Sequence, residues 1–178
     1  SAGTVTPPRV SVDTLMFQGD HVRIGWQPRE TILTPQSISN GNFGPIWSSP
    51  SFDSFESNAA HAYASPLYID ALTMSSGVYV GGTFSVLLVA TSNNFVYAVN
   101  AFTTTVGASQ VPAGTILWSR SLGTPAPNLN ADGVPLGILS TPVVGASPPP
   151  PRLSVQAPDP TAGPRGLPFT TNARNTRT

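Results

Sequence analysis

The chain has 178 residues, of which 39% are hydrophobic, enough for one domain with a modest core. Only 9% of the residues are charged, well below the ~25% usual for soluble domains, and the formal net charge is zero. A neutral chain of this kind argues against nucleic acid or an anionic membrane as the main partner.

The residue types that are missing narrow the chemistry further. The chain has no Cys, which excludes disulfides, thiol catalysis and thiolate metal sites. It has no Asn-x-Ser/Thr sequon, which excludes N-glycosylation. No apolar run approaches the ~18 residues that span a bilayer, so we expect no membrane span. The chain begins at Ser1 rather than Met, as it would after signal cleavage or at an artificial boundary.

Residues 1–20 are expected to form an N-terminal arm with one peripheral strand. Two prolines come first, and RVSVDTLMF then alternates, which would bury Val10, Val12, Leu15 and Phe17. From residue 21 we expect a partial domain that runs to residue 144. Its first part contains predicted short strands in HVRIGW (21–26) and FGPIWSS (43–49), one helical turn in TPQSIS (34–39) and a connecting loop over 51–64.

Residues 65–122 predict the main structural feature, a four-stranded antiparallel sheet. The four strands are SPLYIDAL (65–72), SVLLVAT (85–91), FVYAVNA (95–101) and TILWSRSL (115–122). Ser92–Asn94 is expected to form a compact turn, because Asn tolerates positive φ. SVLLVAT is almost continuously apolar, as expected for a strand that is buried on both faces. A sheet of this size has two open edges that need cover in water.

The remaining segments are expected to be less regular. AFTTTVGASQVPAG (101–114) is predicted as a loop, and GILSTPVV (137–144) as the start of a further strand. Residues 145–178 form a proline-rich tail, expected to be polyproline II or extended chain with no face to bury. If the tail is held in place, either the domain's own sheet edge or another copy must hold it. The charged residues of the tail are Arg152, Arg165, Arg174 and Arg177, against Asp159.

From about Glu30 to Val144 the chain resembles the N-terminal part of quinoprotein-like β-propellers, the repeat family named for pyrroloquinoline quinone. ETILTPQSI and FGPIWSSP resemble the opening segment of the family, and AYASPLYI resembles the start of a blade. VLLVATSNNFVYAVNA resembles the central hairpin, ILWSRSLG the last strand, and GILSTPVV the first strand of the next blade. The resemblance implies an all-β fold with one four-stranded antiparallel propeller-like blade, flanking partial-blade strands and the extended proline-rich tail.

The chain departs from this family in two respects. A propeller closes with about 4–8 blades, whereas here the second blade gives way to the tail after one strand. LTMSSGVYVGGTF also makes the first hairpin longer than the usual short connection. Cofactor and calcium ligands of the family's enzymes come from many blades, and no motif for them can be matched here. The resemblance therefore implies no cofactor and no metal ligand in this chain.

The few residues that suggest chemistry have simpler explanations. His21 and His61 lie far apart in the sequence, so a metal site that joins them to Asp53, Glu56 or Asp70 is less favoured than solvent-facing histidines. Asp53 and Glu56 resemble a catalytic carboxylate pair, but a solvated loop explains them better, because such a pair needs enforced proximity.

Glycine and tryptophan provide two more candidate sites. Gly81–Gly82 has no following helix, which disfavours a phosphate-binding loop. The three tryptophans are expected to pack in the core or between sheets, and stacking on a carbohydrate is the alternative. They are Trp26, Trp47 and Trp118.

The segment SPPPP (147–151) resembles modules of hydroxyproline-rich extracellular glycoproteins of green algae and plants. The resemblance implies hydroxylation and O-glycosylation at Pro148, Pro149, Pro150 and Pro151, and an unmodified linker is the alternative.

These observations favour a non-catalytic structural module of a secreted or cell-surface protein. We expect it to bind other copies of itself through open sheet edges and terminal arms, as a filament subunit would, with segment 1–15 and the tail as candidate donors. Two alternatives remain open: a fragment of a quinoprotein-type oxidoreductase, and a module that binds glycans through exposed aromatic residues.

Overall fold

The computed structural model describes residues 13–18, 22, 25, 33–126 and 134–145, and the backbone of 152–157 and 169–173. These residues form antiparallel β-sheets with one short helix, α1 (Pro35–Ser37), which continues as a π-helical turn over Ile38–Asn42. Thr34 caps this helix, because its hydroxyl accepts from the Ser37 N–H at 3.1 Å. The all-β class and the helical turn predicted at 34–39 are confirmed.

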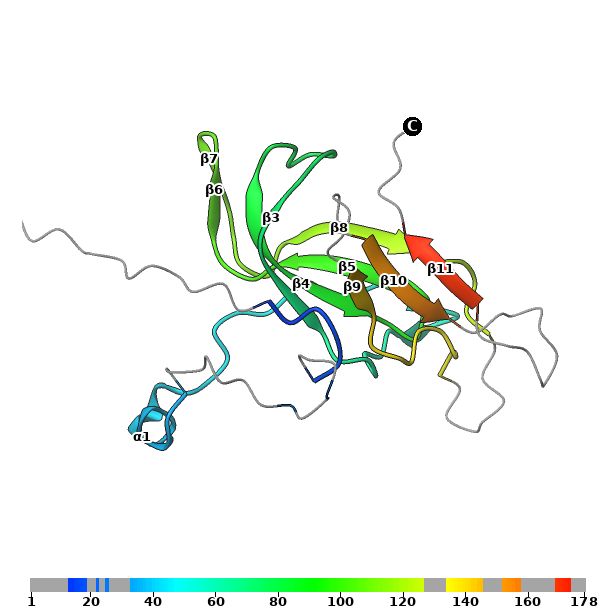
Figure 1. Cartoon of the computed structure of the whole chain (residues 1–178), viewed down its shortest axis with the longest axis horizontal. Helices are drawn as coiled ribbons and strands as arrows, with labels where there is room; N and C mark the ends of the chain where they lie inside the picture. Colours follow the sequence, from blue (N-terminus) through cyan, green and yellow to red (C-terminus); the bar gives the residue numbers. More distant parts are fainter. Residues whose placement is uncertain are drawn as a thin grey trace, which may run out of the picture.

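The main sheet has four antiparallel strands in the order β3 (Leu67–Thr73), β4 (Thr83–Ala90), β5 (Phe95–Asn100) and β8 (Ile116–Ser121). Each strand pairs with the next one in the list, so the sheet is a simple meander (Figure 1). The four predicted strands are confirmed to within two residues at each end.

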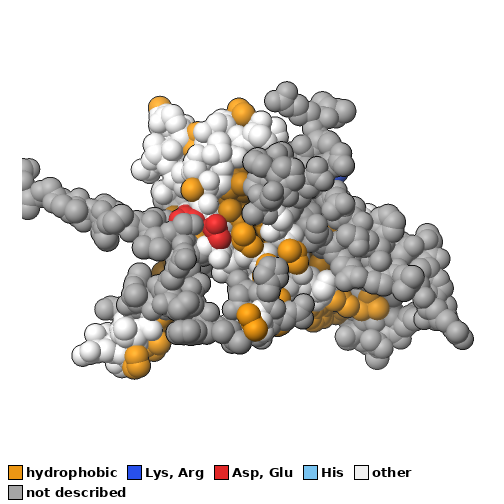
Figure 2. Space-filling model, in the orientation of Figure 1, with side chains coloured by type: hydrophobic (Ala, Val, Ile, Leu, Met, Phe, Trp, Pro, Cys, Tyr) orange, Lys and Arg blue, Asp and Glu red, His pale blue; other side chains and the backbone are white. Residues whose placement is uncertain are grey.

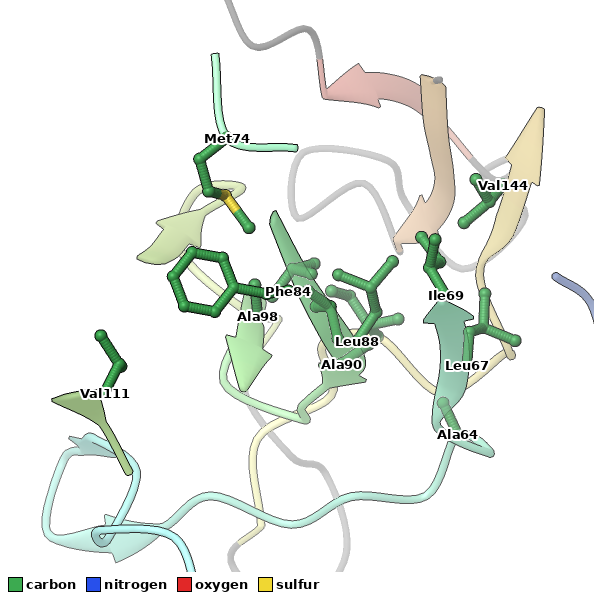
Figure 3. Close-up of a cluster of buried hydrophobic side chains, with 13 residues drawn as sticks. Ala64, Leu67, Ile69, Met74, Phe84, Leu88, Ala90, Ala98, Val111 and Val144 are labelled. Carbon is green, nitrogen blue, oxygen red and sulfur yellow. The ribbon is translucent and has the colours of Figure 1, made fainter. Parts of the chain in front are cut away.

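One face of this sheet carries the core. Alternate residues of β4 are buried, as the period of two in a strand requires. Ile138 and Val144, from the segment after the sheet, join the same buried cluster. Figure 3 shows Val144 beside Ile69 of β3. The cluster consists of Ala64, Leu67, Ile69, Met74, Phe84, Val86, Leu88, Ala90, Val96, Ala98, Val111, Ile138 and Val144.

The other face of the sheet is covered at β5 by residues 52–53. Phe52 stacks on Tyr97 with ring centroids 4.3 Å apart, and the Asp53 N–H donates to the Tyr97 hydroxyl at 3.3 Å. Five of the six β5 residues are buried, so β5 is buried on both faces. On β4 one set of alternate residues is only half buried, so the prediction that SVLLVAT is buried on both faces is wrong.

A β-bulge changes the register of β3 between Ile69 and Leu72. Ala71 adopts φ +55°, and the extra residue returns Leu72 to the side of the core, where it packs against the buried cluster. A regular strand would have placed Leu72 on the opposite face.

Two segments expected as loops form small hairpins. β1 (Ser54–Phe55) pairs with β2 (Asn58–Ala59), and β6 (Thr104–Val106) pairs with β7 (Ser109–Val111). Glu56 and Ser57 both have positive φ, at 47° and 67°, which is the geometry of a tight type I′ turn. The loop predictions for 51–64 and 101–114 are therefore wrong at these strands.

The buried Asn100 side chain holds the β6–β7 hairpin against the main sheet. Its Nδ2 donates to the carbonyls of Val111 and Pro112, both at 3.0 Å, and its Oδ1 accepts from the Thr104 hydroxyl at 3.4 Å. The first two bonds anchor the end of β7 and the residue after it.

A second sheet has three antiparallel strands in the order β11 (Phe169–Ala173), β10 (Arg152–Ala157) and β9 (Val143–Gly145). The tail was expected to be polyproline II or extended chain, and instead it contains the paired strands β10 and β11. RLSVQA alternates apolar and polar residues, a strand pattern that the proline-rich composition obscures. β10 pairs with β9, so this part of the tail is held by a strand of its own chain.

Three other predicted strands differ from the structure. Residues 43–49 form no strand, and Pro45 removes a backbone donor there. GILSTPVV contributes to a strand only from Val143, because Pro142 removes another donor and Ile138 bonds to a turn of the main sheet, its N–H donating to the Thr91 carbonyl at 3.2 Å. Val22 lies in an exposed turn rather than in the strand predicted at 21–26, most of which falls outside the described residues.

Candidate functional site: the sheet edges

The outer edge of β3 is occupied by Asp13–Leu15, which we call the arm segment. The Thr14 N–H donates to the Tyr68 carbonyl at 2.8 Å, and the Tyr68 N–H donates to the Thr14 carbonyl at 3.0 Å. These two bonds form the pair that joins antiparallel strands, but here the pairing is limited to Thr14 in the arm segment and Tyr68 in β3.

Of the strand predicted in RVSVDTLMF, the described residues form a single bridge at Thr14. Leu15 is half buried as predicted, whereas the prediction that Phe17 is buried is wrong, because Phe17 lies in a turn and is 43% exposed. Val10 and Val12 lie outside the described residues.

Side chains add specificity to this contact. The Asp13 carboxylate accepts a hydrogen bond from the Asp70 N–H at 2.7 Å. The Asp70 carboxylate in turn accepts from the hydroxyls of Ser85, at 2.7 Å, and Tyr68, at 3.3 Å. Asp70 follows Tyr68 by two residues in β3, so its N–H faces the same outer edge, where it bonds to a side chain rather than to a strand partner.

The arm segment also contacts the second sheet. The Val144 N–H in β9 donates to the Leu15 carbonyl at 3.0 Å, and the half-buried Leu15 packs against the core. The arm segment therefore lies between β3 and β9 and is hydrogen-bonded on both sides. We call the backbone groups of Tyr68, Asp70 and Val144 that bond to it the arm site. Figure 1 shows the start of the described chain, in dark blue, beside the main sheet.

The opposite edge of the main sheet is β8. β8 pairs with β5 on one side, and no other described strand pairs with it. Its last three residues, Ser119–Ser121, are exposed. An open edge presents backbone donors and acceptors that another strand can pair with.

Charge is unevenly distributed among the residues whose side chains the structure describes. Asp13, Asp53, Glu56 and Asp70 are acidic, whereas Arg120 alone is basic within these residues. Figure 2 accordingly shows acidic side chains, in red, near the middle of one face, with apolar side chains scattered around them.

The predicted turn between β4 and β5 is confirmed, but its burial is not foreseen. Thr91, Ser92, Asn93 and Asn94 are all at most 2% exposed, and Asn94 has φ +61°. The burial arises because several parts of the chain bond to this turn. The donors and acceptors come from Asp53, His61, Leu122, Thr124 and Ile138.

Gly137 lies directly against this turn. A Cβ at position 137 would overlap the Ser92 carbonyl oxygen and approach the Asn94 N at 2.6 Å and the Asn94 Oδ1 at 2.7 Å. Three buried side-chain oxygens in this region have no hydrogen-bond donor in the described part of the chain: Asp53 Oδ1, Asn93 Oδ1 and Asn94 Oδ1.

Where the structure describes them, the residues considered for metal or acid–base chemistry do not come together in one site. His61 is exposed and stacks on Tyr63, with ring centroids 5.7 Å apart. Asp53 is half buried behind Tyr97, whereas Glu56 is exposed in the β1–β2 turn. Within the described residues, no group of three or more His, Cys, Asp or Glu side chains could hold a metal ion. His21 lies outside the described residues.

The other candidate positions have structural roles where they are described. The amides of Gly81 and Gly82 donate to the carbonyls of Met74 and Tyr79, at 2.8 and 3.0 Å, so they are engaged within their own loop. Trp118 is half buried and packs against the core, and Trp47 is half buried next to Gly114. Trp26 and Pro148–Pro151 lie outside the described residues.

No helix among the described residues is long and apolar enough to cross a membrane. Comparison with known proteins identifies no relative of this chain: no family model matches it, and neither does any curated protein or solved structure.

Proposed function

We propose that this chain is a non-catalytic structural module of a secreted or cell-surface protein, and that it binds copies of itself into a filament. The main support is the state of the sheet edges. Among the described strands β8 pairs with β5 alone, and the β3 edge is paired with another segment at Thr14. The β8 edge suits an additional strand and the β3 edge binds an extended segment, and strand addition between copies that does not close on itself builds a fibre.

The charge distribution supports contact between the tail of one copy and residues 33–145 of a neighbouring copy. Residues 33–145 carry Asp53, Glu56, Asp70 and Asp132 against Arg120, whereas the tail carries four Arg residues against Asp159. A basic tail and an acidic body attract each other at low ionic strength, and salt screens this attraction. Assembly should therefore weaken when NaCl is raised from about 0.05 M to about 0.5 M.

The proposal is tested on the purified full chain by electron microscopy and light scattering over a wide range of protein concentration. Filaments, or a mass that grows with concentration, support it. A monomer of 18.5 kDa at every concentration, with both termini cut readily by protease, overturns it. Deletion of residues 1–15 and deletion of residues 146–178, made separately, show which terminus assembly requires.

The meander of β3, β4, β5 and β8 favours one alternative from a different class. Four antiparallel strands in chain order are also the arrangement of one propeller blade, so the chain could be a fragment of a quinoprotein-type oxidoreductase. That alternative requires a longer parent protein with further blade repeats after GILSTPVV. A parent transcript that lacks such repeats excludes it.

If the protein is secreted, as proposed, the prolines of the tail are also expected to be modified. In a secreted chain, Pro148–Pro151 would be hydroxylated and O-glycosylated, and glycans there would add polar surface to a protein with few charges. Mass spectrometry of the natural material tests this, because an unmodified SPPPP peptide contradicts it.

A further inference from the structure

We propose that the arm site is filled by the arm segment of a neighbouring copy in the assembled state, so that the module polymerises by exchanging Asp13–Leu15. This inference rests on the proposed self-association and names the element that carries it. The arm segment has defined partners on both sides: Thr14 bonds to Tyr68 in β3, and Leu15 bonds to Val144 in β9.

The contacts of the arm segment can be reproduced without change by a second copy. The bonds to Tyr68 and Val144 use backbone groups, and the bond from the Asp70 N–H uses the Asp13 carboxylate. An identical segment from a neighbour offers the same groups in the same order. The exchange therefore loses none of these hydrogen bonds, which is why swapping of an identical element is a low-cost route to assembly.

The length of chain after the arm segment allows this exchange. Residues 16–32 separate Leu15 from Leu33, and at ~3.4 Å per residue this stretch can reach about 60 Å when extended. That reach exceeds the ~17–20 Å length of a typical strand. The arm segment can therefore pass to a neighbour while the main sheet keeps its own structure.

Specificity distinguishes the arm site from the open β8 edge. At the arm site, the Asp13 carboxylate accepts from the outward-facing Asp70 N–H of β3, and Leu15 packs against the core. β8 offers pairing to an added strand, but no described segment shows which side chains would fit it. The arm site therefore selects one occupant, the segment Asp13–Leu15, and it receives this segment from the next copy in a head-to-tail series.

Engineered cysteines test the exchange in the full chain, which has no Cys of its own. In the double variant Thr14→Cys/Tyr68→Cys, the two positions face each other across an antiparallel pair, where the Cα separation of about 5.5 Å suits a disulfide. The variant is assembled under reducing conditions, oxidised, denatured and run on a non-reducing gel. Exchange predicts a ladder at multiples of 18.5 kDa that collapses with reductant.

The control pair is Thr73→Cys/Thr83→Cys. These residues face each other on β3 and β4, with hydroxyl oxygens 3.0 Å apart, so their disulfide must form within one copy and run as a monomer. If filaments form but the Thr14→Cys/Tyr68→Cys variant also runs as a monomer with an internal disulfide, the exchange is wrong and the proposed self-association stands. If neither filaments nor a ladder form, the proposed function fails as well.

A second variant tests the exchange without new disulfides. Thr14→Pro removes the N–H that bonds to the Tyr68 carbonyl, so the altered subunit keeps its arm site but donates a poor arm. Added at about one part in ten to wild-type protein, it should end growing filaments and shorten them severalfold. An unchanged length distribution would contradict the exchange.

Discussion

Gly137→Ala should destabilise the protein, although the same change elsewhere in a chain is often harmless. At Gly137 an added Cβ would overlap the buried Ser92 carbonyl oxygen and lie 2.6 Å from the Asn94 N. Ordinary contacts of a Cβ begin near 3.4 Å, so the backbone of one segment must move. Both obstructing atoms belong to backbone that is fixed by bonds from His61, Leu122 and Ile138, which leaves little room for a shift.

The magnitude follows from two opposing effects. Alanine restricts the unfolded chain more than glycine does, which favours folding by about 0.4–1 kcal/mol when the native conformation is compatible. Overpacking in a tight interior typically costs about 1–3 kcal/mol. Because the obstruction is backbone rather than a flexible side chain, we expect overpacking to dominate, with a net loss of about 2 kcal/mol. For a protein of this size that corresponds to a fall in Tm of roughly 4–8 °C.

Thermal unfolding followed by circular dichroism measures this effect, with Gly44→Ala as the matched control. A Cβ at Gly44 meets nothing within 4 Å, so this variant should match wild type or exceed it by about 1 °C. A Gly137→Ala variant as stable as Gly44→Ala would refute the close approach of residues 137–138 to the Thr91–Asn94 turn.

Three further substitutions test other parts of the fold by the same thermal assay. Asn100→Ala removes the two bonds that Asn100 Nδ2 donates to the carbonyls of Val111 and Pro112 and should cost about 2–4 kcal/mol; a loss below 1 kcal/mol would contradict the anchoring role. Tyr97→Phe keeps the stacking on Phe52 but removes the acceptor of the Asp53 N–H, so we expect a smaller loss of about 1 kcal/mol. Ala71→Gly relieves the φ of +55° and should stabilise by about 1 kcal/mol, whereas destabilisation would argue against this bulge geometry.

The main sheet could be predicted from sequence because the signals for its strands lie within each short segment. Runs of β-branched and aromatic residues between turn residues define β4 and β5, and Asn94 supplies the positive φ that the turn between them needs. The burial of that turn could not be predicted, because it depends on residues that are distant in sequence. Asp53 and Ile138, for example, reach the turn only in the folded chain.

At the candidate site too, the local pattern predicts a strand, whereas the distant residues that pair with it cannot be predicted from sequence. Alternation in RVSVDTLMF marks a strand, but nothing in these letters identifies Tyr68 and Val144 as the partners of the arm segment. The tail was harder to predict because composition and pattern disagree. Many prolines indicate an extended chain, whereas the alternation in RLSVQA indicates a strand, and in β10 the alternation prevails.

The position of the arm segment has a mechanical consequence. Its backbone bonds run roughly perpendicular to the segment and lie on both of its flanks, at Tyr68 and at Val144. A pull along the segment would therefore load these bonds in shear and break them together, whereas a pull across a single edge would peel them apart one by one. A short segment held on two flanks thus resists tension better than the same segment held on one.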